Sequence, residues 1–218
     1  MPDLNNEFVF NEEFRTLARL KMNDPTFTYK DWGNEDLKTL RSEIRDFYRN
    51  EQKGLCCYCR EVISLKSASN AQVEHIIPKS KNRKFIFTPK NMCTICADCN
   101  EIKRNKEVLK TIEDTTVRPY TNYPSSKNAF IIYHPHFEEY KDHIFKVGDL
   151  YIDLSKKGSY TIYICELNRK AHEFGIEPEQ LTQSELKGIM QKFIDETDYS
   201  RAQVLFDRLR NYFIKICF

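Results

Sequence analysis

The spacing of apolar residues predicts two helices near the start of the chain. In residues 34–51 apolar side chains recur at intervals of three and four, which is the period of one helix face. Asn34 is suited to cap the first turn of this helix. An earlier helix is expected over about residues 9–22, and Pro25 would end it. Both helices would present one apolar face to a core.

Two more helices are expected at the C-terminal end. Thr182 and Glu185 form a capping-box pattern before one of them, and the last helix spans about residues 199–216. Because this last helix is apolar over more than one face, it must be buried on several sides. Either residues 129–165 cover it, or part of it docks on a partner, which would be a second copy or a larger regulatory protein such as an ATPase.

The middle of the chain favours strands. Residues 73–77 are rich in β-branched side chains and end at Pro78, a short second strand is expected over 92–95, and residues 98–111 are typical of a helix. Between residues 129 and 165, β-rich runs alternate with Gly-containing turn signals. The four strands expected there lie near 129–133, 143–147, 150–153 and 160–165.

Composition places the chain among globular proteins. It has 218 residues, of which 40% are hydrophobic and 30% charged, and its apolar stretches are far too short to span a bilayer. The first residues lack the basic region and apolar core of a secretion signal, so a cytoplasmic location without membrane association is expected. In that reducing compartment, eight cysteines favour metal ligands or free thiols over disulfides.

Positive charge is concentrated in the middle of the chain. Residues 53–118 hold 13 Lys and Arg against 7 Asp and Glu, a local net charge of +6, although the whole chain carries only +2. This basic segment indicates either a site for a polyanion or a solvated charged face.

Four cysteines have the spacing of a metal site. Cys56 and Cys59 form one C-x-x-C pair, and Cys96 and Cys99 form another after 36 intervening residues. Two such turns can aim four thiolates at one point, which favours a structural zinc site with four cysteine ligands over buried free thiols. The remaining cysteines are interpreted as small core residues: Cys57, Cys93, Cys165 and Cys217.

The residues around the second pair carry a more specific pattern. Between the pairs stands Glu74-His75-Ile-Ile-Pro78, followed by Asn91, and the second pair continues as Cys99-Asn100-Glu-Ile-Lys103. This arrangement resembles the HNH endonuclease family over about residues 55–110. A looser resemblance, in the helix before Gly54 and in residues 134–137 and 166–169, is to small bacterial HNH proteins, some of which are partners of ATPases in Septu-type anti-phage systems.

The chemistry of these residues agrees with the resemblance. His75 is suited to act as a general base near neutral pH, and Asn100 and Lys103 share one face of a helix near its phosphate-favouring N-terminus. Oxygen ligands from Glu74 and Asn100 would suit Mg²⁺ or Mn²⁺. Neighbours on a regular strand face opposite sides, so Glu74 and His75 can serve one site only if the strand bends or ends there. The resemblance implies that it does.

Other polar residues leave alternatives open. Asn91 is either a turn residue or, as the resemblance implies, the residue that orients the loop. Basic side chains beside the site would contact phosphates or form a solvated surface: Lys79, Lys81, Arg83, Lys84, Lys103 and Arg104. His134, His136 and His143 suggest a second metal site, but their loose spacing favours surface or core polar roles.

The sequence therefore predicts an α+β protein with three parts: N-terminal helices (1–54), a zinc-stapled ββα-metal nuclease core (55–120), and a β-then-α extension (121–218). The expected function is metal-dependent hydrolysis of nucleic acid, with DNA favoured by analogy and 5′-phosphate products implied by the resemblance. The alternatives are an inactive zinc-ribbon module that only binds nucleic acid, and a toxin-type nuclease held by an immunity protein.

Overall fold

The contacts of the chain divide it into two compact units. A computed structural model describes residues 2–110, 120–147, 149–174 and 183–217. The first unit comprises Met1–Phe145 and Ile152–Leu167, and the second comprises Lys146–Tyr151 and Asn168–Phe218. The boundaries predicted at residues 54 and 120 both lie inside the first unit and remain predictions.

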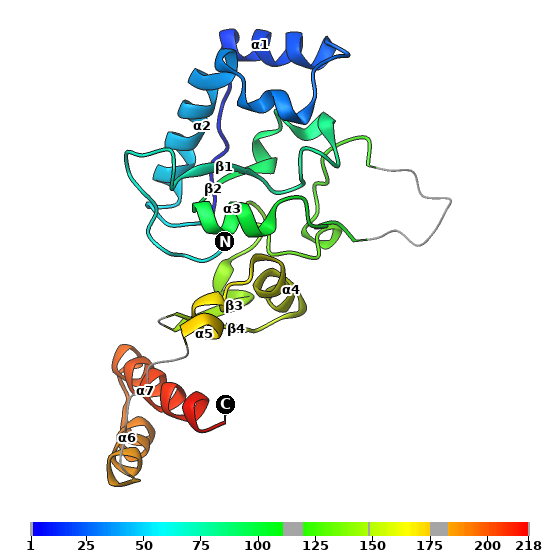
Figure 1. Cartoon of the computed structure of the whole chain (residues 1–218). Helices are drawn as coiled ribbons and strands as arrows, with labels where there is room; N and C mark the ends of the chain where they lie inside the picture. Colours follow the sequence, from blue (N-terminus) through cyan, green and yellow to red (C-terminus); the bar gives the residue numbers. More distant parts are fainter. Residues whose placement is uncertain (1, 111–119, 148, 175–182, 218) are drawn as a thin grey trace. The chain divides into compact units, whose positions relative to one another are not determined.

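Helices begin the first unit, as the apolar spacing predicts (Figure 1). Their bounds are α1 (Glu12–Asn23), the 3-10 turns η1 (Tyr29–Gly33) and η2 (Glu35–Leu37), and α2 (Lys38–Glu51). The side chain of Asn11 caps α1 by accepting a hydrogen bond from the backbone of Phe14. Leu40, Ile44 and Tyr48 are buried along one face of α2. Asn34 precedes η2 but makes no side-chain cap, so the expected N-cap is wrong in its detail.

A short antiparallel ribbon and one helix form the centre of this unit. Strands β1 (Gln72–His75) and β2 (Met92–Ile95) pair so that Glu74 lies opposite Cys93. Helix α3 (Ala97–Lys103) contacts β1, and α2 contacts both strands (Figure 1). This is the expected ββα order. The second strand is confirmed at its predicted bounds, whereas β1 ends at His75 and α3 is shorter than the helix predicted over 98–111.

The four strands expected between residues 129 and 165 are only partly present. β3 (Ile144–Val147) and β4 (Leu150–Asp153) form a two-stranded sheet. Residues 129–133 contribute only an isolated bridge, between Leu109 and Phe130. The strand expected over 160–165 is wrong, because these residues belong to α4 (Lys156–Cys165). The remaining 3-10 turns are η3 (Arg83–Phe85), η4 (Pro89–Asn91), η5 (Lys127–Ala129) and η6 (Tyr140–Asp142).

A cap and a close packing contact explain why α4 is a helix. The side chain of Ser155 accepts a hydrogen bond from the backbone of Gly158, as an N-cap does. Gly158 packs so closely that a Cβ atom there would lie 1.8 Å from the carbonyl oxygen of His143. These contacts outweigh the β-branched residues that suggested a strand, because β propensity is weak compared with packing.

The second unit ends in three helices: α5 (Arg169–Phe174), α6 (Gln183–Asp195) and α7 (Tyr199–Cys217). α6 packs on α7, and the rings of Phe193 and Phe206 lie 5.8 Å apart. The helix predicted over 199–216 is confirmed. The capping box at Thr182 lies outside the described residues, as does the side chain of Cys217. Within the described part of the chain, no helix combines the length and apolar character needed to cross a membrane.

Candidate functional site

The two predicted cysteine pairs come together. The Sγ atoms of Cys56, Cys59, Cys96 and Cys99 all lie within 4.8 Å of one another, and all four residues are buried. The first pair lies in a turn after α2, and the second lies at the N-terminus of α3. Gln52 ties this turn to β2, because its side chain bonds the backbone N–H and carbonyl of Thr94 and the carbonyl of Leu55.

This cluster has the dimensions of a tetrahedral zinc site. With zinc–sulfur distances of about 2.3 Å, the sulfurs of such a site stand roughly 3.8 Å apart. The Sγ atoms of Cys59 and Cys96 are separated by 3.6 Å. Four cysteine sulfurs at this spacing are the ligand set of a structural zinc site. The four residues therefore fit zinc.

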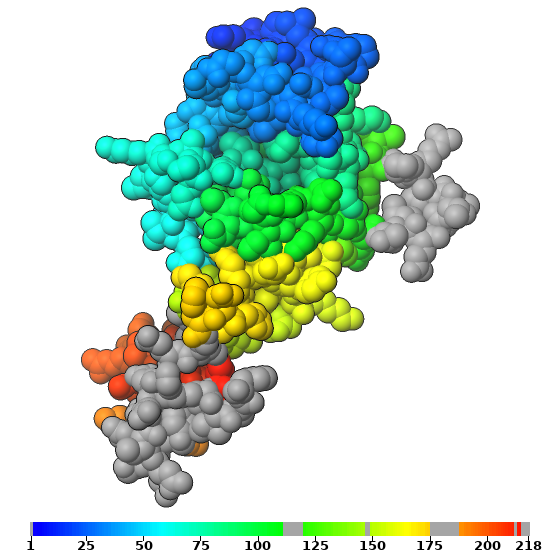
Figure 2. All heavy atoms as spheres, viewed as in Figure 1, coloured from blue at the N-terminus to red at the C-terminus, as the bar shows by residue number. Residues whose placement is uncertain are grey.

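A pocket of about 440 Å³ lies beside β1 and α3. Its lining combines Glu74 and His75 from the end of β1 with Asn100 from α3. The surface of the first unit is hollowed between its blue N-terminal segment and the green segment that contains α3 (Figure 2). Because β1 ends at His75, adjacent residues can both line one pocket, which meets the geometric condition that the sequence set.

The imidazole of His75 is held in one tautomer. Its Nε2 atom lies 2.9 Å from the carbonyl oxygen of Ile86. Since a carbonyl can only accept, Nε2 carries the proton and Nδ1 keeps its lone pair. Nδ1 is buried and has no hydrogen-bond partner among the described residues. Burial, followed by the charge of Lys79, holds the pKa of His75 well below its usual value, so the ring is neutral.

The buried carboxylate of Glu74 is paired with the buried side chain of a lysine. Its Oε1 atom forms an ion pair with the ammonium group of Lys103, whose side chain has no exposed surface. The same ammonium donates to the carbonyl oxygen of Ile76, 3.0 Å away. Lys103 is thus placed behind Glu74, where its ammonium orients the carboxylate and has no surface with which to contact a phosphate.

Asn91 fixes the loop that follows β1. Its Oδ1 atom accepts a hydrogen bond from the backbone of Ile77, and its Nδ2 atom donates to the carbonyls of Ile77 and Phe85. The side chain is wholly buried. Of the two alternatives for Asn91, this geometry is that of the loop-orienting residue, because one amide joins both ends of the loop.

Asn100 lies on α3 and is half-buried. Its Nδ2 atom donates to the side-chain oxygen of Gln72 on β1. With the amide nitrogen engaged in this way, Oδ1 is the atom of Asn100 suited to a cation. The pocket therefore joins a carboxylate and an amide oxygen, the donor types that Mg²⁺ and Mn²⁺ prefer.

Comparison with known families identifies this arrangement. Residues 56–106 match the family model of the HNH endonuclease. The chain contains an HNH endonuclease domain. No curated protein and no solved structure shows a significant match to the chain. The matched segment begins at Cys56 and includes β1, β2 and α3, so the cysteine cluster and the pocket residues named so far lie within the HNH domain.

The predicted basic residues take different positions around the HNH site. Lys79 and Arg104 line the pocket. Lys81 pairs with Glu107 at 2.7 Å, and Lys84 is exposed. The guanidinium group of Arg83 instead donates to four backbone carbonyls and so holds the end of α1. Those carbonyls belong to Lys21, Met22, Asp24 and Phe27. The sequence analysis had expected this residue to contact phosphates or solvent.

The sequence analysis missed two aromatic residues at the site. Trp32 is buried with its ring 4.7 Å from the imidazole of His75, in an edge-to-face arrangement. Tyr29 lines the pocket itself. Both lie on η1, more than twenty residues before the matched segment, and no motif connects them to it. The run of aromatic residues around Trp32 was the available signal.

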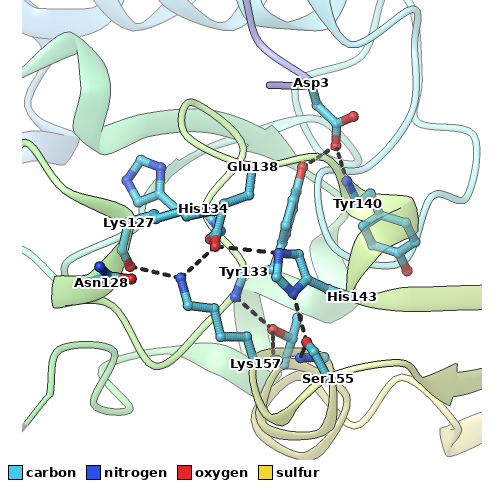
Figure 3. A network of polar contacts seen from close by, with 12 residues as sticks. Asp3, Lys127, Asn128, Tyr133, His134, Glu138, Tyr140, His143, Ser155 and Lys157 are labelled. Atoms are coloured by element: carbon cyan, nitrogen blue, oxygen red, sulfur yellow. Dashed lines mark hydrogen bonds and ion pairs between the residues drawn. The ribbon is translucent and has the colours of Figure 1, made fainter. Parts of the chain in front are cut away.

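Two of the three histidines considered for a second metal site, His134 and His143, lie in a network of polar contacts (Figure 3). His134 is wholly buried: its Nδ1 atom accepts from the backbone of His136, and its Nε2 atom lies 2.8 Å from the Tyr123 hydroxyl. Glu138 pairs with Lys157 at 2.6 Å and lies 3.4 Å from Nε2 of His143. Among the described residues, the one group of three or more His, Cys, Asp or Glu side chains close enough to hold a metal is the cysteine cluster, so these histidines form no such group and the core role applies.

Substitution of zinc ligands tests the cluster. We expect Cys59→Ser and Cys99→Ser to lose both bound zinc and cooperative unfolding, because zinc binding to such sites contributes about 10–16 kcal/mol. Cys165→Ala, which alters a buried cysteine outside the cluster, should keep its zinc. Elemental analysis and thermal unfolding measure the two effects. Active wild-type protein with essentially no zinc would rule out a structural zinc site.

The buried histidines predict how stability depends on pH. Burial lowers the pKa of both His134 and His136, so the unfolded chain gains protons near pH 6.5 while the folded chain does not. The free energy of unfolding should therefore fall as the pH drops below about 6.5. In His134→Gln the slope of the free energy of unfolding against pH should decrease by up to about 1.4 kcal/mol per pH unit.

Fluorescence of Trp32, the one tryptophan, can follow this unfolding. His172→Gln, at an exposed position, is the matched control. An unchanged slope in His134→Gln would contradict the assignment of this pH dependence to His134.

Proposed function

We propose that this protein is a metal-dependent endonuclease that hydrolyses phosphodiester bonds, with DNA as its substrate. The observation that carries the proposal is a neutral His75, with its Nδ1 lone pair free of a proton, in the pocket that Glu74 and Asn100 also line. A nuclease needs a base for water, and this imidazole is in the required protonation state.

In the proposed reaction, Nδ1 of His75 accepts a proton from a water molecule as its oxygen attacks the phosphorus. The bond to the 3′-oxygen breaks, and the product carries a 5′-phosphate. Glu74 and Asn100 are the residues that would hold Mg²⁺ or Mn²⁺. Such an ion supplies charge stabilisation for the transition state and the leaving oxygen.

The neighbouring residues have supporting roles in this proposal. Lys103 is a positioning residue, because its ammonium contacts Glu74 and is shielded from substrate. Asn91 holds the loop whose Ile86 carbonyl fixes the tautomer of His75. Lys79 and Arg104 on the pocket, with Lys81 and Lys84 nearby on the same loop, would attract the phosphate backbone without selecting a base sequence.

Replacing His75 tests the function. We expect His75→Ala to reduce cleavage of plasmid DNA in Mg²⁺ by about 10²–10⁴-fold, because removal of a general base has an effect of this size. Binding of DNA should remain, since the substitution removes no positive charge. His172→Ala, which removes an exposed histidine, is the matched control.

Three results of this experiment have different meanings. Unchanged cleavage by folded His75→Ala would remove His75 from the mechanism. Wild-type protein that binds DNA but cleaves neither DNA nor RNA with Mg²⁺ or Mn²⁺ would support the inactive zinc-ribbon alternative. Cleavage that a co-encoded small protein blocks would support the toxin alternative.

The resemblance to Septu-type proteins extends the proposal to a cytoplasmic effector of anti-phage defence with an ATPase partner. Several apolar side chains on α6 and α7 support a protein partner, since they are exposed in the second unit: Ile194, Tyr199, Val204, Phe206 and Phe213. Apolar groups gathered on neighbouring helices are typical of protein interaction sites.

A charge placed on this surface tests the partner. We expect Val204→Asp to weaken co-purification of the ATPase by about tenfold or more, because burial of one valine contributes roughly 1.5 kcal/mol or more. Nuclease activity should persist. Val9→Asp, at an exposed valine in the first unit, should leave the complex intact. Equal retention of the ATPase by both variants would exclude Val204 from the interface.

A further inference from the structure

An aromatic side chain from outside the matched segment forms part of the pocket wall. Tyr29 lines the pocket together with Glu74, His75 and Asn100, and 43% of its surface is exposed. The other described lining residues are polar or charged, apart from Pro78. The pocket therefore presents one solvent-accessible phenol ring among groups suited to phosphate and metal.

The backbone that carries Tyr29 is held in place. A capping box fixes the start of η1, because the Asp31 carboxylate accepts from the backbone N–H and hydroxyl of Thr28 at 2.7 and 2.8 Å. At the other end of the turn, Trp32 is buried between His75 and Phe87, with ring centroids 4.7 and 5.8 Å away. The backbone of Tyr29 is thus held at a fixed position relative to His75, the proposed general base.

This position suits a nucleobase. Lys79 and Arg104 on the same pocket offer positive charge to the phosphates, whereas Tyr29 offers a flat apolar face. Stacking of a base on an aromatic ring contributes about 1–3 kcal/mol and tolerates any base, because every base has such a face. Inside a duplex, however, each base is already stacked on both faces.

We propose that Tyr29 stacks on a nucleobase next to the scissile phosphate, and that the site therefore takes strands whose bases are exposed, as in single-stranded or locally opened DNA. This inference rests on the proposed nuclease function and names the substrate class of the same pocket. It makes Tyr29 a specificity-determining residue that acts on substrate affinity, whereas His75 acts on the chemical step.

Binding and cleavage by Tyr29 variants test the inference. We expect Tyr29→Ala to lower kcat/KM on single-stranded DNA by roughly 5- to 150-fold, mainly through KM, the change that corresponds to 1–3 kcal/mol. The loss on fully paired DNA should be much smaller. Tyr29→Phe, which keeps the ring, should stay within about threefold of wild type. Tyr163→Ala, at another exposed tyrosine of the first unit, is the matched control.

A binding measurement without added Mg²⁺ separates the contribution of the nucleobases from that of the phosphates. A thymidine oligonucleotide and an abasic oligonucleotide of the same length carry the same phosphates. Wild-type protein and Tyr29→Phe should prefer the thymidine oligonucleotide, and Tyr29→Ala should lose most of that preference.

The inference is overturned if Tyr29→Phe is as impaired as Tyr29→Ala, because the hydroxyl group would then make the contact. It is also overturned if Tyr29→Ala keeps the preference for bases. If wild-type protein cleaves nothing, the proposed nuclease function fails, while the binding preference still decides whether Tyr29 stacks on a base.

Discussion

The four-cysteine cluster is the constraint on which the HNH domain depends. The ribbon has two four-residue strands, and α3 has seven residues, so these elements are too short to hold one another in place through apolar burial. The cluster joins the turn after α2 to the N-terminus of α3. Gln52 ties that turn to β2, which pairs with β1. Zinc at this point would therefore hold α3 beside the ribbon that carries Glu74 and His75, so that these residues and Asn100 line one pocket.

Buried polar contacts then fix each side chain of the site. The Ile86 carbonyl selects the tautomer of His75, and that carbonyl belongs to the loop that Asn91 holds at Ile77 and Phe85. Lys103 has no exposed surface, and its ammonium faces the carboxylate of Glu74. A buried charge is costly unless it is paired, so Lys103 and Glu74 constrain each other's positions. The polar residues of the motif therefore have two roles. Glu74, His75 and Asn100 line the pocket, whereas Asn91 and Lys103 hold the pocket residues in position.

Sequence reasoning succeeded where local chemistry decides the structure. The C-x-x-C pairs predict the cluster, and the short apolar run at 92–95 is β2 at its expected bounds. It failed where distant segments decide. Residues 160–165 have the β-branched composition of a strand, but the Ser155 cap and the packing of Gly158 on His143 make them helical. Arg83 was assigned to phosphates from its basic loop, yet it holds carbonyls at the end of α1, about sixty residues earlier. Tyr29 and Trp32 were missed for the same reason, because they lie far in sequence from the motif residues that they approach in the structure.

The central proposal is that the protein uses two kinds of metal site, a structural one at the cysteines and a catalytic one at Glu74 and Asn100. Its most direct test removes loosely bound divalent ions by desalting into metal-free buffer, and then measures zinc content and DNA cleavage in the same sample. The account predicts that cleavage disappears while one zinc per chain remains, and that added Mg²⁺ or Mn²⁺ restores cleavage. Cleavage that persists with zinc alone, or that is lost only in proportion to zinc, would contradict it.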